Sequence, residues 1–294
     1  MRSEGAELDA VLAELQREQR IRDISGSGSG FTDLDRALDG LLPGLCWLIG
    51  PPGVGKTSFA KQLVDQVAQQ HRAPALFFSF AESKKELRIK TLARLSGLDH
   101  REIRRGSAYL LHWYGVPRLA ADEAGRLPPS WEKLKRMAEE ARSWLDATYL
   151  VECRRDWSVA QIESQVGGLI AATGNKPGII VIDDGHRLGN ARRPLPARLP
   201  IVTEQLQQLA ANFQAPLVAI WPELDTSLGL SPEHWSEKVP GAEVVLVMRR
   251  DLERTRKLTE PNQAIVLHIV TNRGGEKGKL AFDFLPNCSR FEAV

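Results

Sequence analysis

The sequence predicts an α/β fold: a mostly parallel sheet with helices on both faces and antiparallel strands at one edge. Three observations support this fold class. From residue 31 to about residue 222, short apolar runs alternate with helical segments, which is the pattern of β-α-β units. A glycine-rich phosphate-binding motif joins one apolar run to a helix. After residue 241 the apolar runs are separated only by turns, which indicates antiparallel strands.

The composition is that of an ordinary globular chain. Hydrophobic residues make up 43% and charged residues 26% of the 294 positions, and no apolar run reaches membrane-spanning length. Cys46, Cys153 and Cys288 lie far apart, so we expect buried thiols rather than a disulfide framework or a zinc site. The first twenty residues lack the apolar core of a secretory signal, which predicts a cytoplasmic protein. A net charge of +2 leaves any nucleic-acid contact to local basic clusters.

The chain is expected to divide into three parts. Leu8, Val11, Leu12 and Leu15 recur at helical spacing, which predicts an amphipathic helix within residues 1–24. The segment "SGSGSG" over residues 25–30 is predicted to be a flexible tether. The remainder, 31–294, is expected to form one large domain.

Strands and helices follow in order along this domain. Helices are expected directly after Lys56, from Ser83 to about Gly97, and from about Val202 to Asn212. The expected strands are "LCWLIG" (45–50), "ALFFSF" (75–80), "GIIVID" (178–183), "PLVAIW" (216–221), "AEVVLVMRR" (242–250), "AIVLHIVTNR" (264–273) and "KLAFDFLP" (279–286).

The first strand leads into a complete G-x-x-x-x-G-K-[ST] motif. In such a loop the glycines turn backbone N–H groups toward phosphates, Lys56 reaches the β and γ oxygens of ATP, and the Thr57 hydroxyl binds Mg²⁺. A glycine-rich turn that binds nothing is the alternative, and the strand and helix on either side argue against it. The expected nucleotide-binding residues are Gly50, Pro51, Pro52, Gly53, Val54, Gly55, Lys56, Thr57 and Ser58.

Two further carboxylates suit phosphoryl transfer. Asp183 ends the strand "GIIVID" and is the expected metal-side carboxylate, with Asp184 beside it. A strand-ending aspartate that only caps a turn is the alternative. Glu82 follows "ALFFSF" and is the candidate that positions and deprotonates water. Alternatively, Glu82 is a solvated acid at the start of the next helix, where negative charge suits the helix dipole.

Over about residues 31–294 the chain resembles the C-terminal motor domain of DnaB-type replicative DNA helicases, which are RecA-like ATPases. The resemblance depends on the order and spacing of several stretches around the phosphate-binding motif. They are "GFTDLDRALDGLLPG", "FFSFAESKKELRIKTLARLSGLDHREIRRG", "IIVIDD", "EVVLVMRRD" and "VTNRGGEKGKLAFDFLPNCSRFEAV".

The resemblance implies a ring, usually of six subunits, with ATP bound at the subunit interfaces. Each site is then completed by an arginine from the neighbouring subunit, and the matching position is Arg273 in "TNRGG". Without the resemblance, Arg273 would be an ordinary solvated charge in a turn. The N-terminal helix and tether occupy the place of the family's linker helix, which packs on an adjacent subunit.

The sequence departs from the family pattern in four places. The family's catalytic glutamate falls on Ala81, so hydrolysis through Glu82 requires a shift of one residue. The sensor glutamine is replaced around 221–223. Residues 107–129 are an expected insertion, and its His112–Tyr114 cluster either stacks on bases, docks a partner or forms a small core. The primase-interacting N-terminal domain has no counterpart, which favours a phage, plasmid or other mobile-element setting.

A basic loop is the expected contact with nucleic acid. Residues 185–200 carry four arginines without an acid and are broken by proline and glycine. They resemble channel-facing loops that bind strand phosphates without reading bases, and a solvated surface loop is the alternative. The four arginines are Arg187, Arg192, Arg193 and Arg198.

Taken together, these features predict a ring-forming ATPase that moves along single-stranded DNA. The expected partners are single-stranded DNA, further copies of the chain, and a loader or replication protein, with no membrane. Two alternatives stay open: a nucleotide-switched assembly protein with negligible turnover, and a recombination ATPase similar to RadA-type proteins, whose "EES" is matched by "AES" at 81–83.

Overall fold

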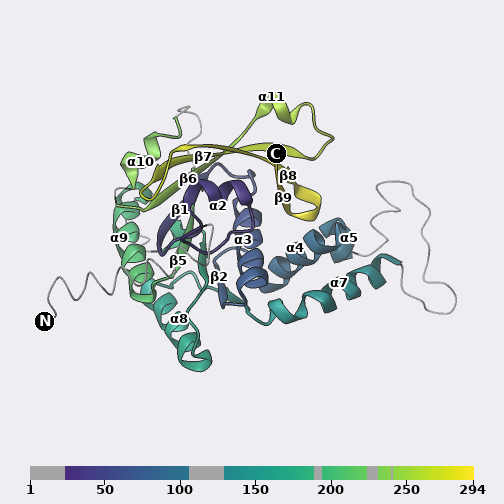
Figure 1. The fold of residues 1–294 in the computed structure, drawn as a ribbon, viewed down its shortest axis with the longest axis horizontal. Helices are drawn as coiled ribbons and strands as arrows, with labels where there is room; N and C mark the ends of the chain where they lie inside the picture. The colour runs from purple at the N-terminus through teal and green to yellow at the C-terminus, as the bar shows by residue number, and fades with distance from the viewer. Residues whose placement is uncertain (1–23, 106–128, 189–193, 224–230, 240) are drawn as a thin grey trace, which may run out of the picture.

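The computed structural model describes residues 24–105, 129–188, 194–223, 231–239 and 241–294 (Figure 1). The predicted N-terminal helix, nearly all of the predicted insertion with His112–Tyr114, and Arg192 and Arg193 lie outside these ranges. Among the described residues, no helix is both long enough and apolar enough to cross a bilayer.

Within the described residues, nine strands form a single sheet that runs through the domain. The first six strands across it are parallel to one another, and the last three pair antiparallel, as the sequence predicts for this edge. One of the three C-terminal strands expected at this edge, β6, instead pairs parallel to β1. The order across the sheet is β3 (Thr148–Glu152), β2 (Ala75–Ser79), β4 (Ile179–Asp183), β5 (Pro216–Pro222), β1 (Gly44–Gly50), β6 (Val244–Arg250), β7 (Gln263–Asn272), β8 (Gly278–Leu285) and β9 (Arg290–Ala293).

Helices cover both faces of this sheet because its central strands are apolar on both sides. Along β1, Cys46 and Leu48 belong to one core cluster, whereas Leu45, Trp47 and Ile49 belong to the other. The first cluster packs under α2 (Thr32–Leu38), α3 (Lys56–His71), α4 (Lys84–Ser96) and α7 (Pro129–Leu145). The second packs under α8 (Val159–Thr173) and α9 (Leu195–Phe213), on the opposite side in Figure 1. Shorter elements are α5 (His100–Arg105), η1 (Gly185–Arg187), α10 (His234–Lys238), α11 (Leu252–Thr255) and η2 (Pro286–Cys288).

The predicted helix after Ser83 has clear boundary signals. The Ser83 hydroxyl accepts a hydrogen bond from Glu86 N, and the Glu86 carboxylate accepts one from Ser83 N, so the pair forms a capping box. Gly97 closes the other end in the left-handed conformation, with φ of 69°. The predicted limits, Ser83 to about Gly97, therefore coincide with the two caps of α4.

Residues 25–30 differ from the predicted tether. Ser27 forms a β-bridge with Leu41, and Ser29, which is 0% exposed, donates its N–H to Asp35 Oδ1 at 2.6 Å. Any side chain at Gly26 would meet the backbone of Leu41 at 2.7 Å. The small residues therefore serve close packing against α2, and the segment is fixed on the domain.

A buried ionic cluster joins α3 to α4. The Asp65 carboxylate pairs with Lys61 and Arg94 and accepts a hydrogen bond from the Thr91 hydroxyl at 2.8 Å. All four side chains are buried. Buried charges are tolerated only when they are paired and hydrogen-bonded, so this cluster specifies how α4 lies against the helix that follows the phosphate-binding loop.

Candidate nucleotide-binding site

The phosphate-binding loop connects the end of β1 to the start of α3. Gly53 and Gly55 have φ values of 83° and 87°, a conformation that side chains disfavour. A Cβ at Gly55 would also meet the rings of Phe284 and Phe291 at 2.8 Å. Backbone conformation and close packing therefore both require glycine at position 55, as the motif predicts.

Lys56 lies against the loop itself. Its Nζ donates hydrogen bonds to the carbonyl oxygens of Gly50 and Pro51, each at 2.8 Å. Burial lowers the pKa of Lys56, and the charges of Asp183, Asp184 and Glu223 oppose that shift. The ammonium is thus partly withdrawn from water at the positive end of α3, where phosphate oxygens would replace the carbonyls.

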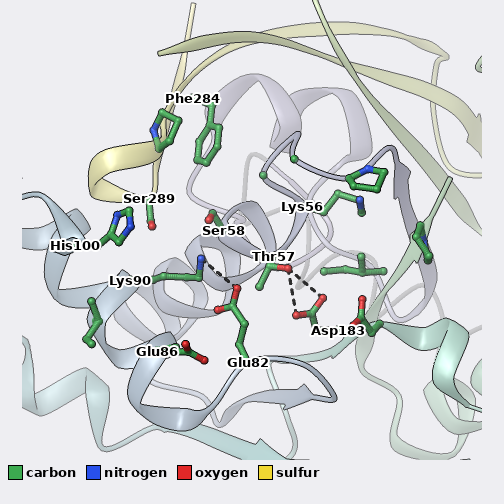
Figure 2. A pocket seen from close by; sticks show the side chains of 18 of the residues that line it. Lys56, Thr57, Ser58, Glu82, Glu86, Lys90, His100, Asp183, Phe284 and Ser289 are labelled. Atoms are coloured by element: carbon green, nitrogen blue, oxygen red, sulfur yellow. Dashed lines mark hydrogen bonds and ion pairs between the residues drawn. The ribbon is translucent and has the colours of Figure 1, made fainter. Parts of the chain in front are cut away.

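Thr57 and Asp183 meet at the centre of the site. The Thr57 Oγ1 lies 3.2 Å from both carboxylate oxygens of Asp183 (Figure 2). Asp183 is 1% exposed, and burial raises its pKa to about 7, with further contributions from the charges of Asp184 and Glu82. A cation would relieve this unfavourable negative charge. Hydroxyl and carboxylate oxygens are the ligands that Mg²⁺ prefers, so these two residues fit the predicted metal role.

Glu82, and not Ala81, supplies a carboxylate to this cavity. The Ala81 side chain is exposed, whereas Glu82 lines the cavity and forms an ion pair with Lys90 of α4, Oε1 to Nζ, at 3.2 Å (Figure 2). The other carboxylate oxygen, Oε2, is buried and has no hydrogen-bond partner among the described residues. One residue after the position that the family pattern gives, a carboxylate with one unpartnered oxygen among the described residues therefore lies in the same cavity as Asp183.

The cavity has a volume of 510 Å³, which is in the range of small-molecule sites. Its far wall comes from the C-terminal strands and α5, through Phe284, Ser289 and His100 (Figure 2). His100 Nδ1 lies 3.0 Å from the Asn287 carbonyl oxygen, which ties α5 to η2. No local sequence motif marks these wall residues or Lys90, so the sequence alone does not predict them.

Arg273 lies at the amino ends of the parallel strands, whereas the phosphate-binding loop lies at their carboxyl ends. Its N–H donates to the Glu243 carbonyl oxygen at 3.0 Å, and the Glu243 carboxylate accepts a hydrogen bond from Leu45 N at 2.7 Å. Arg273 is therefore beside the amino end of β1, whereas Lys56 follows its carboxyl end. Seven strand residues span about 20 Å. The Arg273 side chain is 61% exposed, and its Nη1 lies 3.7 Å from Glu243 Oε1.

The predicted basic loop is shorter than expected. Arg187 lies in η1 with its Nε 3.2 Å from Asp184 Oδ2, so an adjacent carboxylate partly balances its charge. Arg198 lies in α9, which begins at Leu195, and is not in a loop. Pro194 and Pro196 explain the difference, because proline fits the first turn of a helix as well as a loop.

Comparisons with known proteins identify a family with a matching sequence. A family model described as "DnaB-like helicase C terminal domain" matches residues 26–222. The probable replicative DNA helicase of Trieres chinensis is 23% identical over 302 residues, covering 96% of this chain and 60% of that protein. This chain therefore spans less than two thirds of that relative.

Two solved structures share the fold. The ATPase domain of G40P superposes with a TM-score of 0.77 at 18% identity, covering 98% of both chains. A DnaB-like replicative helicase, from a study of its interactions with primase, gives a TM-score of 0.73 at 19% identity, covering 95% of this chain and 66% of that one. The RecA-like fold predicted from the sequence is thereby confirmed.

The raised pKa of Asp183 predicts how the free energy of unfolding depends on pH. Because its pKa in the folded protein, about 7, exceeds the usual 3.8, folding favours the protonated form. The free energy of unfolding should therefore fall as the pH rises from about 4 to about 7. Asp183→Asn removes this loss, so its stability relative to the parent protein should grow by about 2–3 kcal/mol between about pH 5 and about pH 8.

Urea unfolding in EDTA measures the difference. The control is Asp156→Asn, which removes an exposed aspartate paired with Arg154. Equal pH dependence of the two variants would contradict the buried, charge-repelled environment of Asp183.

Proposed function

The chain belongs to the family of DnaB-like helicase C-terminal domains, and we propose that it forms a ring whose subunits hydrolyse Mg²⁺-ATP at their interfaces to move along single-stranded DNA. The observation that carries this proposal is the position of Arg273. About 20 Å of β1 separate it from the phosphate-binding loop of its own chain. An exposed guanidinium there can reach phosphates only in another copy.

A site shared between copies implies repeated head-to-tail contacts. Contacts of that kind close into a ring when the rotation between subunits permits, and six subunits are the number expected from the resemblance. The guanidinium keeps its charge and can neutralise developing charge on the transferring phosphoryl oxygens. Arg273 therefore acts as the arginine finger of the neighbouring site.

Within one subunit, the loop from Gly50 to Ser58 holds the phosphates and Lys56 binds the β and γ oxygens. Thr57 and Asp183 would hold Mg²⁺, which would supply positive charge to the phosphate groups. Glu82 orients the attacking water through its free carboxylate oxygen. Lys90 fixes the other oxygen of Glu82, so the direction of that carboxylate depends on the position of α4.

The strand is proposed to bind beside the carboxyl end of β4. Arg187 and Arg198 flank the connection that contains Arg192 and Arg193, and the four guanidinium groups contact strand phosphates without reading sequence. Because the Asp184 carboxylate partly balances the charge of Arg187, we expect Arg187 to contribute less to phosphate binding than the other arginines. A loader or another replication protein completes the proposed set of partners, and the location is cytoplasmic.

The direct test is ATP turnover with and without single-stranded DNA, followed by unwinding of a forked duplex. We expect the strand to stimulate turnover, and we expect Lys56→Ala to abolish turnover while the fold is retained, because the β and γ oxygens lose their ammonium partner. Strand-stimulated turnover without unwinding would favour a recombination ATPase. Nucleotide binding without turnover would favour an assembly switch.

Shared sites predict complementation between variants. Arg273→Ala should reduce turnover about 10³-fold or more, because the charge on the transferring group is no longer neutralised. Mixed with Lys56→Ala subunits, it should regain part of the activity, since some interfaces then combine an intact loop with an intact Arg273. Turnover of the mixture is compared with that of each variant alone. If verified mixed rings stay inactive, the site is not shared.

The role of Glu82 is tested by Glu82→Gln. The amide cannot accept a proton from water, so hydrolysis should slow about 10²-fold or more while ATP binding persists. Glu86→Gln is the matched control, because Glu86 lines the same cavity but its carboxylate caps α4. Single-turnover hydrolysis and nucleotide titration separate chemistry from binding. Equal rates for the two variants would assign the water to another carboxylate, such as Asp184.

A further inference from the structure

Glu243 directly precedes β6, and its carboxylate faces the Arg273 side chain. One carboxylate oxygen, Oε2, accepts the hydrogen bond from Leu45 N at 2.7 Å, and the other, Oε1, lies 3.7 Å from Arg273 Nη1. The Glu243 side chain is 33% exposed. One oxygen of this carboxylate is therefore anchored on β1, while the other is directed at the guanidinium.

Close packing keeps the Glu243 side chain over the start of β1. A Cβ at Gly44 would meet Glu243 Cγ at 2.8 Å and Cδ at 3.0 Å. Distances this short leave no room for a side chain at position 44. Together with the hydrogen bond from Leu45, this contact holds the Glu243 carboxylate in one place instead of leaving it free in solvent.

The backbone at Arg273 is fixed as well. Its N–H donates to the Glu243 carbonyl oxygen at 3.0 Å, and the neighbouring Asn272 Nδ2 donates to the Ala37 carbonyl oxygen of α2 at 2.9 Å. A Cβ at Gly275 would meet the same Ala37 oxygen at 3.0 Å, so the connection that follows β7 lies directly on α2. With the backbone held, the direction of the Arg273 side chain depends on the groups around it.

These groups are apolar apart from one carboxylate. Arg273 and Glu243 line a cavity of 260 Å³ at the amino ends of β1 and β5, together with apolar side chains such as Leu42 and Pro216. Among the described residues that line this cavity, Glu243 is the only one whose charge is opposite to that of Arg273. The carboxylate that attracts the guanidinium here is thus already fixed to β1.

We propose that Glu243 is a positioning residue for Arg273, and that its anchored carboxylate holds the guanidinium in the direction in which it meets the phosphates of the neighbouring copy. The inference rests on the proposed function, in which Arg273 completes the site of another subunit. A guanidinium carries several N–H groups, so Nη1 can face Glu243 while the others contact phosphoryl oxygens. Because an oriented side chain loses less conformational freedom on binding, the ion pair raises turnover at the shared site.

Mixed rings with one kind of active interface test this role. Lys56→Ala subunits keep Arg273 but lack a working loop, whereas Arg273→Ala subunits keep the loop. In their mixture, turnover arises only where Arg273 of the first kind meets the loop of the second. Glu243→Gln is then added to one kind of subunit or to the other. The glutamine oxygen can still accept the hydrogen bond from Leu45 N, while the charge that faces Arg273 is removed.

The two placements should give different results. On the Lys56→Ala subunits, which supply Arg273, Glu243→Gln should lower turnover at saturating ATP about fivefold, which is the largest effect expected for an exposed ion pair. On the Arg273→Ala subunits, which supply the loop, it should leave turnover unchanged, and a general folding defect would instead lower turnover in both placements.

Glu276→Gln on the Lys56→Ala subunits is the matched control. It removes an equal charge from the connection that carries Arg273, and the exposed Glu276 side chain forms no ion pair with another described residue. We expect this variant to leave turnover of the mixture unchanged.

Each other outcome overturns the inference. A loss in both placements, or only on the Arg273→Ala subunits, would show that Glu243 supports its own chain through β1. An increase would show that Glu243 restrains Arg273, and no change would show that other groups direct it. An equal loss with Glu276→Gln would assign the effect to the charge of the connection as a whole. If verified mixed rings without Glu243→Gln are inactive, the shared site fails, and this inference fails with it.

Discussion

The contact between Thr57 and Asp183 is the constraint on which the site depends. Its two residues are 126 positions apart, and their side chains meet at 3.2 Å only because β1, β5 and β4 lie side by side in parallel. Parallel strands bring their carboxyl ends to one edge of the sheet, where a loop and a carboxylate can face the same ligand. Burial at this edge, together with the charges of Asp184 and Glu82, raises the pKa of Asp183 to about 7, and the Mg²⁺ of the proposed function would offset this negative charge.

Two groups of buried, paired charges lie beside the site among the described residues. Asp65 with Lys61 and Arg94 fixes α4 against α3, and Glu223 with Arg249 fixes the end of β5 against β6. Apolar residues could fill these positions at similar or lower free-energy cost. An ionic contact, however, specifies one arrangement of two elements. Of these elements, α3 directly follows the phosphate-binding loop, and β5 and β6 lie on either side of β1, which leads into it.

The sheet also separates the two groups of residues that the proposed reaction requires. Its carboxyl edge carries Lys56, Asp183 and Glu82, whereas Arg273 lies at the amino edge with an exposed side chain. A rigid sheet keeps these two groups apart within a chain, so the proposed function requires the complete set to form between chains. In the proposed function, ring assembly and turnover both follow from this geometric separation.

The sequence by itself determined the features whose signals are local: the seven predicted strands, the caps of α4, the phosphate-binding loop and the aspartate that ends β4. It did not reveal α8, whose helical pattern contains two adjacent glycines, or the short half-buried edge strand β3. Only the tertiary structure decided which distant residues meet, such as Glu82 with Lys90, Gly55 with Phe284 and Glu223 with Arg249. The physical reason is that hydrophobic periodicity and caps act over a few residues, whereas these contacts arise from strand order and helix packing across the whole chain.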